Sequence, residues 1–480
     1  MSRPVRFVFA LAGVSGCAIV GEDYVAPVVE TDASWAASAE PTVEDTQPVE
    51  IGRWWLAFED DDLDALVHDS LRGNLDLAAA VERVRQSAAI RARSAGQRFP
   101  DVDATGSYSR TRTSGTTFPP FPSQTFDLYS LGLDFDWEID VWGRVTRSIE
   151  AADADYQASV EDLRDVEAVL VASVASAYVD LRTGQERLDV ALQNIEIQRR
   201  SLDLTETRFR AGAAPALDVA QARTNLANTE SELPTIQADV RDATLRLGVL
   251  VGRSPAELID AFDAGVEIPT APILVGAGVP ADVLRRRPDV RAAERRLAAE
   301  VARIGVESGD LFPRFTLIGS LGYESTESGQ VFDAGSQTFG FGPAFSWNLF
   351  DGGRERSDIE AQRAAADAAL LDYRQSVLLA FEEAEQSLYR LARERERVDA
   401  LKRAADAARD SADLSRQLYL EGRSDFQNVL DAERSLFAAQ ESLILGRSAV
   451  AQTYVSLHRA LGGGWEPPPE SPDDPERADP

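Results

Sequence analysis

Residues that carry most enzymatic chemistry are scarce in this sequence. Its 480 residues include two histidines, His68 and His458, and a single cysteine, Cys17. Catalytic triads and metal centres need several such side chains to converge in one place. The composition therefore argues against an enzyme and against a metal cofactor. Lysine is scarce too: Lys402 is the only one, and arginine supplies nearly all of the positive charge.

Positive charge as a whole is outnumbered. The chain carries 49 basic and 80 acidic residues, which gives a formal net charge of −31. Phosphate groups would be repelled by such a chain, so we do not expect a nucleic-acid partner. The acidic residues are typical of a strongly solvated surface, and a specific role in binding cations is the alternative interpretation.

Apolar runs long enough to cross a bilayer as a helix are also missing. The run near the N-terminus, Val5–Val14, is too short to span a membrane and is preceded and interrupted by the basic residues Arg3 and Arg6. This layout is typical of a signal peptide, which we predict over residues 1–16. Since no other stretch reaches spanning length, the sequence does not predict a helical membrane protein.

The single cysteine follows two small residues, Ser15 and Gly16. This pattern resembles the lipobox of bacterial lipoproteins, in which the cysteine becomes the acylated first residue. We predict a covalent lipid on Cys17, and Ala18 in the next position favours delivery to the outer membrane. The alternative is an ordinary signal peptide that contains a cysteine by chance. One acyl anchor holds a protein only weakly, so a second form of membrane attachment is expected.

Internal duplication organises the rest of the chain. Gly212 and Gly422 lie in similar local sequences, and their offset (422 − 212 = 210) also aligns Trp137 with Trp347. Upstream the offset becomes 213. Self-similarity of this kind indicates repeated structural units. We therefore predict an N-terminal segment, a first repeat, a joint, a second repeat and a disordered acidic, proline-rich tail. These cover residues 17–62, 63–252, 253–278, 279–464 and 465–480, respectively.

Each repeat begins with a predicted helix, which is followed by alternating segments. The helices cover residues 63–97 and 281–309, and each ends near a Phe-Pro pair, because proline disfavours helical backbone in the residue before it. Next come stretches in which apolar residues such as Leu131, Leu133 and Phe135 alternate with polar ones. Period two over about ten residues is typical of a transmembrane β-strand. The predicted strands lie near residues 101–113, 130–139, 314–326 and 339–349, with hairpin loops at 113–124 and 325–336.

Aromatic residues are concentrated on the apolar face of these strands. Trp137, Trp142 and Trp347 gather at one end, where a belt of aromatic side chains at a membrane interface would lie. The alternative is an ordinary antiparallel sheet that covers a core with one face.

A helical hairpin completes each repeat. Residues 144–210 and 354–420 contain no proline or turn cluster, so each is predicted to form one helix roughly 100 Å long if straight. Apolar positions recur with the 3.5-residue period of coiled coils. A glycine-centred turn follows, and helices at 216–250 and 425–461 run back.

Four strands per chain cannot close a membrane barrel, since the smallest such barrels have about eight strands. An open sheet edge in lipid would leave backbone groups unpaired at a cost of several kcal/mol each. Two chains would close only a narrow barrel, whereas three would supply twelve strands and leave room for a channel. The membrane interpretation therefore predicts a homotrimer.

Four longer motifs resemble the TolC-like outer-membrane efflux family, in the lipoprotein branch that serves resistance–nodulation–division (RND) pumps. The resemblance covers nearly everything from Cys17 to Gly464. It implies a mixed α and β membrane protein: a homotrimer with a twelve-stranded outer-membrane β-barrel, a coiled-coil helical tube in the periplasm and a collar near the joint. It also implies a periplasmic adaptor and an inner-membrane RND pump as partners, and the export of drugs or other small solutes. The motifs are Gly21–Pro27, Trp137–Arg144, Leu284–Glu294 and Trp347–Arg354.

The resemblance also assigns roles at the hairpin turns, which in this family meet the adaptor. Gly212, Leu217 and Asp218 match one tip motif of the family, and Gly422 matches the other, with Ser424 standing where some relatives carry an arginine. Without the resemblance, the two glycines are simply turn residues that need positive φ.

A pore constriction is implied one turn further along the second tip. Asp431 would form a threefold ring of carboxylates, which attracts cations and repels anions. Asn428 stands where some relatives carry a second aspartate, so the ring is expected to be weaker here. Asp431 as a solvated acid near a helix N-terminus is the alternative.

Two other functions remain open at this stage. The same duct could serve type I protein secretion, and the helices could belong to a periplasmic coiled-coil scaffold without a pore.

Overall fold

The computed structural model describes residues 19–28, 34–36, 43–44, 51–116, 122–259, 262, 267–272, 275–276, 280–281 and 286–466. The predicted signal peptide, Cys17 and the predicted tail beyond Glu466 lie outside the described residues. The chain divides into two compact units, each assembled from three separate stretches. The sheet unit comprises Met1–Val28, Val84–Ser159 and Ala293–Tyr373, and the helical unit comprises Val29–Arg83, Val160–Ala292 and Arg374–Pro480.

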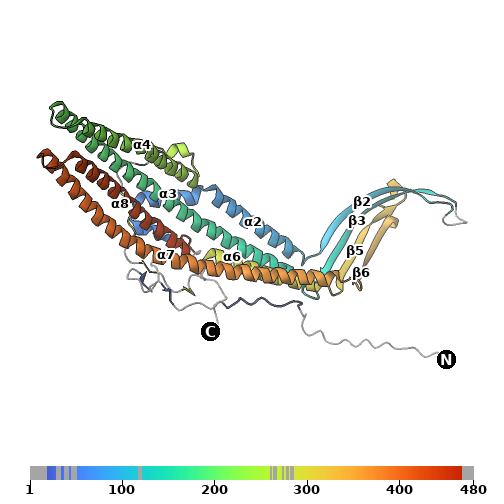
Figure 1. Cartoon of the computed structure of the whole chain (residues 1–480). Coiled ribbons are helices and arrows are strands. Elements are labelled where there is room, and N and C mark those ends of the chain that lie inside the picture. Colours follow the sequence, from blue (N-terminus) through green and yellow to red (C-terminus); the bar gives the residue numbers. More distant parts are fainter. Residues whose placement is uncertain are drawn as a thin grey trace, which may run out of the picture. The chain divides into compact units, whose positions relative to one another are not determined.

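One four-stranded antiparallel sheet dominates the sheet unit (Figure 1). Its strands are β2 (Asp101–Arg112), β3 (Thr125–Ile139), β5 (Arg314–Ser325) and β6 (Gln337–Ser346). The order β2-β3-β5-β6 joins the two repeats through the β3–β5 pair and leaves β2 and β6 at the edges. The loop between β5 and β6 carries two short 3-10 turns, η4 (Ser328–Gln330) and η5 (Ala334–Ser336). The four predicted strands are confirmed, although β3 begins at Thr125, earlier than the predicted residue 130.

Cross-strand register separates the apolar from the polar side chains. Leu133 of β3 pairs with Leu321 of β5, which pairs with Phe339 of β6. The next residue of β3, Asp134, pairs with Ser320. Because successive side chains of a strand point to opposite faces, the first three share one face and the other two share the opposite face. The apolar face is uncovered within the chain, as the side chains of Phe339, Phe341 and Phe345 show at 85%, 74% and 70% exposure.

Strand β6 is shorter than the alternation predicted. It ends at Ser346, so Trp347 and Leu349 lie beyond it. The chain turns here because Asp351 accepts hydrogen bonds from the backbone N–H groups of Gly353 and Glu355, both at 2.7 Å. These bonds cap helix α7, which follows. The alternation of apolar and polar residues in the sequence therefore extends beyond the last residue of the strand.

Equal helix lengths make the duplication visible. The long helices α3 (Arg144–Arg210) and α7 (Arg354–Leu420) both have 67 residues, and their partners α4 (Ala216–Leu250) and α8 (Phe426–Ala460) both have 35. Both pairs are related by the offset of 210. The shorter helices α2 (Leu75–Gly96) and α6 (Pro288–Gly309) have 22 residues each and are related by 213. The predicted duplication is therefore confirmed element by element.

Two helix boundaries differ from the prediction. The stretch 63–97 forms two helices, α1 (Asp61–Gly73) and α2, instead of one. Asn74 separates them: its amide Nδ2 donates to the carbonyl oxygen of Leu250 at 2.9 Å, and its Oδ1 accepts from the N–H of Leu77 at 2.9 Å. The stretch 281–309 is also interrupted: residues 280, 281 and 286 are helical, the helix is broken at Arg287, and α6 begins at Pro288 because proline favours the first position of a helix.

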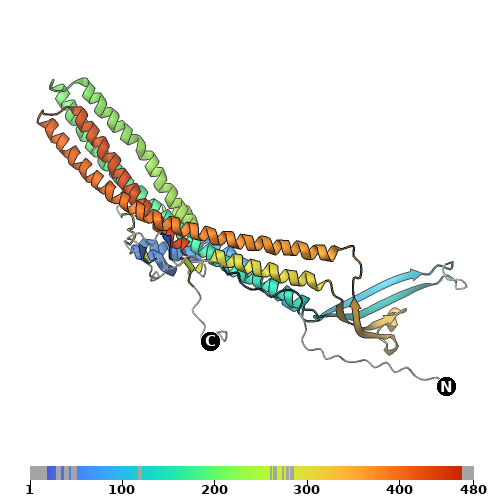
Figure 2. The same ribbon diagram turned by 60° about the horizontal axis from the view of Figure 1, so that its bottom comes forward.

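Two antiparallel hairpins, α3/α4 and α7/α8, make up most of the helical unit, and they lie alongside each other in both views (Figures 1 and 2). Coiled-coil positions of α7 are buried as predicted, with Ala384, Leu388 and Leu391 at 0%, 1% and 2% exposure. None of the helices that the structure describes combines the length and the apolar character needed to cross a bilayer.

A row of polar contacts, which we call the polar seam, joins α3 to α8. Three of its α3 residues are spaced by seven, as expected for one face of a coiled coil. The hydrogen-bonded pairs are Thr183–Ser448 (2.8 Å), Arg187–Glu441 (2.6 Å), Asn194–Gln440 (3.0 Å) and Ser201–Glu433 (2.7 Å).

Smaller elements from the N-terminal segment and the joint belong to the helical unit. The 3-10 helix η2 (Ile51–Phe58) buries Trp54, whose ring stacks on His458 of α8 at 5.4 Å. Burial lowers the pKa of His458 to about 4, so the ring is neutral at physiological pH. The joint forms a 3-10 helix, η3 (Pro255–Leu258), and strand β4 (Val275–Gly276), which pairs in parallel with β1 (Val43–Glu44).

All four hairpin helices end in the same motif. At the end of α3, the N–H of Ala213 donates to the carbonyl of Arg208 (2.8 Å), and the N–H of Gly212 donates to that of Phe209 (2.9 Å). These are the two bonds of a Schellman motif, which needs positive φ at the glycine. Gly212, Gly252, Gly422 and Gly462 have φ of 75°, 71°, 71° and 79°.

Replacing these glycines by alanine should have unequal costs. A Cβ at Gly252 would lie 1.8 Å from the carbonyl oxygen of Gly73, whereas one at Gly212 would meet nothing within 4 Å. We expect Gly212→Ala to cost about 1–2 kcal/mol from positive φ alone, and Gly252→Ala roughly 3 kcal/mol or more because the backbones must also separate. Thermal unfolding in detergent, followed by far-ultraviolet circular dichroism, measures the difference. Equal losses in the two variants would contradict the predicted contact.

Candidate functional site

Acidic side chains gather at one end of the polar face of the sheet. Asp103 of β2 pairs with Asp134 of β3, and Asp136 follows on the same face. All three line a hollow of about 510 Å³, whose wall also includes Ser320 of β5 and apolar residues such as Phe135 and Phe341. Thr105 donates its hydroxyl to Asp134 at 2.9 Å. This face is suited to contact with water, in contrast to the aromatic face behind it.

The three predicted interface tryptophans lie at the same end of the sheet unit. The indole Nε1 of Trp137 donates to the carbonyl of Arg98 (3.0 Å), and that of Trp347 donates to the carbonyl of Leu311 (3.1 Å). The two acceptors are related by the offset of 213, so both repeats make the same bond. Trp142 donates to the carbonyl of Pro313 at 2.9 Å. Each ring thus has its polar atom satisfied by the Phe-Pro segments, as amphipathic interface residues require.

An extended N-terminal segment is fixed to the junction between β3 and α3. The guanidinium of Arg147, which is 4% exposed, donates to the carbonyls of Val20 (3.1 Å) and Gly21 (3.2 Å) and to the carboxylate of Asp23 (2.7 Å). The N–H of Val20 donates to the carbonyl of Trp142 at 2.9 Å. We call residues 19–24 and Arg147 the N-terminal clamp.

Glycines allow the close approach in this clamp. Gly21 has φ of +93°, and a Cβ there would lie 2.6 Å from the Cα of Gly305 in α6. Tyr24 completes the contact, because its hydroxyl donates to Glu294 of α6 at 3.0 Å. Burial, and then the charge of Glu294, raise the pKa of Tyr24 well above its usual value, so the phenol remains a donor.

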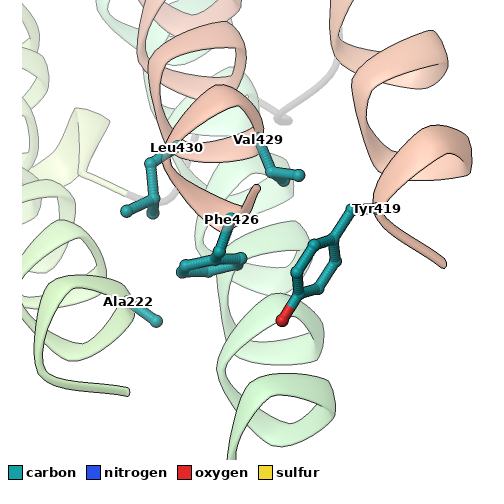
Figure 3. Packing of buried hydrophobic residues seen from close by; sticks show 5 residues of the cluster. All are labelled: Ala222, Tyr419, Phe426, Val429 and Leu430. Carbon is teal, nitrogen blue, oxygen red and sulfur yellow. The ribbon is translucent and has the colours of Figure 1, made fainter. Parts of the chain in front are cut away.

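At the hairpin turns, a small apolar cluster joins the two hairpins. Figure 3 shows the ring of Phe426 between Ala222 of α4 and the ring of Tyr419, at the end of α7. The two ring centroids lie 5.3 Å apart. Arg208 of α3 lies 4.5 Å from the centroid of the Tyr419 ring and donates to the Tyr419 carbonyl at 3.0 Å.

The predicted docking residues lie in or next to the two hairpin turns: Gly212, Leu217 and Asp218 between α3 and the start of α4, and Gly422 and Ser424 between α7 and α8. Leu217 is 63% exposed, although its side chain is apolar. Partial burial and the neighbouring Asp425 raise the pKa of Asp218, and Arg208 opposes this shift. The positive φ of Gly212 and Gly422 fits their interpretation as turn residues.

The predicted constriction residues lie on the exposed side of α8. Asp431 accepts a hydrogen bond from Gln427 (3.0 Å) and lies 3.9 Å from Arg434, both on its own helix. Asn428 donates to Ser424 at 2.9 Å. Among the described residues, the side-chain contacts of Asp431 and Asn428 thus stay within α8 and the turn before it.

Comparison with known proteins identifies the chain. The profile of the family described as outer membrane efflux protein matches residues 66–253 and 279–463. The chain belongs to the outer membrane efflux protein family. It is 32% identical to nodulation protein T of Rhizobium leguminosarum bv. trifolii, over 95% of this chain and 96% of that one. It is also 32% identical to the pyoverdine export outer membrane protein OpmQ of Pseudomonas aeruginosa, over 87% and 88% of the two chains.

A solved structure supports the membership. The outer-membrane channel OprN superposes on this efflux protein with a TM-score of 0.87 at 37% identity, covering 93% of this chain and 100% of OprN. The predicted TolC-like family, its fold class, its function as an outer-membrane efflux component and its outer-membrane location are therefore confirmed. The relatives are efflux and channel proteins rather than enzymes. No group of three or more potential metal ligands occurs among the described residues.

Sequence reasoning missed two charged residues of this efflux protein. The sequence around Arg147 does not distinguish it from other arginines in helices. Its repeat counterpart is Ser357 (357 − 147 = 210), so only the comparison of the two repeats could have drawn attention to it. Glu433 lies in α8, where three acidic residues balance three arginines, yet it is only 2% exposed. Its repeat counterpart is Arg223, and this reversal of charge was the available signal.

Adding one methyl group at Gly21 should release the N-terminal clamp. Gly21→Ala combines an unfavourable positive φ with a clash against the backbone of Gly305, so residues 19–24 should detach from α3 and α6. Limited proteolysis should then remove the N-terminal segment at least about ten times faster than in the wild type. Gly96→Ala is the matched control, because a Cβ there meets nothing within 4 Å. Equal digestion of Gly21→Ala and wild type would show that the clamp does not hold the segment.

Proposed function

We propose that three copies of this efflux protein close into one channel, in which each chain supplies four of twelve barrel strands. The observation that carries the proposal is the sheet itself: one face exposes Phe339, Phe341 and Phe345, the other carries acids, and β2 and β6 are free to pair with other copies. In lipid, both edges must find backbone partners. Pairing β6 of one copy with β2 of the next satisfies them and directs the polar face into a water-filled lumen.

The partners we propose follow from family membership. An outer-membrane duct cannot energise transport, so an inner-membrane pump of the RND type must drive the cargo, and a periplasmic adaptor must bridge the two. The hairpin turns are the docking surface we propose for the adaptor, since exposed apolar side chains such as Leu217 are typical of protein contact sites. The duct itself works without catalytic chemistry.

Small solutes are the cargo class that we propose. OpmQ is named for the export of pyoverdine, and the acidic polar face of the sheet is suited to passing water-soluble or amphiphilic molecules. A wide aqueous lumen discriminates weakly, so the choice among solutes belongs to the pump.

A covalent lipid on Cys17 is the second membrane attachment that we propose, beside the barrel. The N-terminal clamp begins at Ile19, two residues beyond Cys17, and its Val20 donates to the backbone carbonyl of Trp142. The intact mass of the purified protein tests the lipid, because a mature N-terminus without added acyl mass would exclude it.

Loss of the protein should lower the tolerance of the cell to exported compounds. Deletion of the gene, followed by a susceptibility screen across antibiotics, dyes, solvents and metals, should reveal at least one compound with a several-fold lower inhibitory concentration. Complementation with the wild-type gene should restore tolerance. Unchanged tolerance to every compound, together with unchanged secretion of small metabolites, would count against the efflux function.

Asp431→Ala should weaken cation preference. With three carboxylates removed from one ring, the attraction of about 1 kcal/mol that a close charge pair has in water is lost. The cation-to-anion permeability ratio should therefore fall by up to about five-fold in planar bilayers, and single-channel conductance should rise as the mouth widens. Asn428→Ala, one turn earlier, removes a side chain but no charge, so the ratio should stay unchanged. Identical ratios for Asp431→Ala and wild type would remove Asp431 from the constriction.

A further inference from the structure

A buried carboxylate lies two residues beyond Asp431. Glu433 of α8 is 2% exposed. Its side chain contacts residues of α3 and α7. Its Oε1 accepts a hydrogen bond from the hydroxyl of Ser201 on α3 at 2.7 Å and lies 3.4 Å from the guanidinium of Arg416 on α7. Its Oε2 is buried and finds no hydrogen-bond donor among the described residues. One half of an ionised carboxylate is therefore neither solvated nor paired.

Such a group destabilises the packing around it while it is charged. A buried charged oxygen without a donor loses its hydration and regains nothing in exchange. Burial accordingly raises the pKa of Glu433, although Ser201 and Arg416 oppose the shift. A carboxyl with a raised pKa binds its proton more tightly in the packed position than in water. The packed arrangement is therefore favoured as pH falls through that pKa and weakened as the carboxyl ionises.

The first repeat provides an internal comparison. Arg416 and Glu433 occupy the positions of Glu206 and Arg223 (416 − 206 = 433 − 223 = 210), with the charges exchanged. The Arg223–Glu206 pair has an Nη2–Oε1 distance of 3.0 Å, and its side chains are 67% and 39% exposed. An arginine–glutamate ion pair therefore bridges the two helices of each hairpin. Only in the second hairpin is the glutamate of the pair buried. Burial of this charge is not a requirement of the hairpin architecture.

Glu433 also lies where α8 is attached to its neighbours. The next residue, Arg434, donates to Asn225 of α4 at 2.8 Å. Glu433 and Arg434 thus form the contacts of this turn of α8 with α3, α7 and α4, whereas the side-chain contacts of Asp431 stay within α8. Asp431 lies on the same helix, two residues before Glu433.

We propose that Glu433 is a positioning residue for the constriction: its buried, incompletely hydrogen-bonded carboxylate keeps the first turns of α8, and with them Asp431, in a metastable packing against α3. This inference rests on the channel function proposed above. Ionised Glu433 makes the packing easy to release, and an uncharged side chain of similar shape makes it firmer. The groups that face Glu433 are the Ser201 hydroxyl from α3 and Arg416 from α7, and Arg434 on its own helix is engaged with Asn225.

Amide hydrogen exchange of the full-length protein in detergent tests the inference. Glu433→Met replaces the carboxylate with an apolar side chain of similar length, so exchange in residues 426–436 should become about ten-fold slower than in the wild type. Arg223→Met is the matched control: it removes the exposed partner at the equivalent position, and exchange in residues 216–226 should change by less than about two-fold. Glu433→Gln, which is closer in shape, should shift exchange in the same direction as Glu433→Met.

A pH series separates a positioning role from simple packing. After correction for the intrinsic chemical rate, wild-type exchange in residues 426–436 should slow as pH falls through the pKa of Glu433. Glu433→Met should lack this step, and Asp431→Asn should retain it. A step that disappears in Asp431→Asn, or survives in Glu433→Met, overturns the inference. So does exchange in Glu433→Met that is as fast as in the wild type or faster, which would make the Glu433–Arg416 pair a stabilising one.

Conductance links the packing to the pore. Glu433→Met should lower single-channel conductance, because Asp431 is held more firmly in place. If exchange slows but conductance does not change, while Asp431→Ala does change it, Glu433 does not position the constriction. Exchange in α8 does not depend on whether Asp431 narrows the pore. A failure of the proposed constriction and a failure of the Glu433 inference can therefore be told apart.

Discussion

The unpaired backbone groups along β2 and β6 constrain this molecule more than any other feature. Among the described residues, β3 and β5 have both of their edges hydrogen-bonded, whereas no strand pairs with the outer edges of β2 and β6; in the closure that we propose, another copy supplies their partners. In water such edges invite non-specific association, and in lipid each unpaired group costs several kcal/mol. The aromatic outer face, the polar inner face and the closure that we propose are all consistent with this single requirement.

Features with a local cause could be predicted from the sequence. The period-two pattern of Leu131, Leu133 and Phe135 sufficed to place strand β3, and the absence of turn residues sufficed to place α3 and α7 to within a residue. The family resemblance then supplied the function and the tip motifs. Features that depend on distant partners could not be predicted in this way. The break at Asn74 depends on a carbonyl 176 residues away, and the end of β6 depends on the cap that Asp351 makes for α7. Both lie within uninterrupted patterns.

The two repeats share a backbone plan but differ in their side chains where they meet other parts of the chain. Arg147 and Trp142 hold the N-terminal segment in the first repeat, whereas their counterparts in the second are Ser357 and Gly352, which have no such segment to hold. The ion pair across each hairpin keeps its geometry and exchanges its charges, and only Glu433 becomes buried. Duplication thus preserved helix lengths and glycine turns, which depend on backbone geometry, and left side chains free to acquire separate roles. These unlike positions were hard to assign because no periodicity marks them.

The N-terminal clamp sets a short tether. Ile19 is held against Gly143, and only two peptide units separate it from Cys17, which together reach at most about 7 Å. A group attached to Cys17 would therefore join the chain within that distance of Ile19, whose neighbour Val20 donates to the backbone carbonyl of Trp142. The lipid that we propose on Cys17 would thus be attached at one fixed place on the sheet unit, and the length of this tether would limit how far its point of attachment can move from the start of the N-terminal clamp.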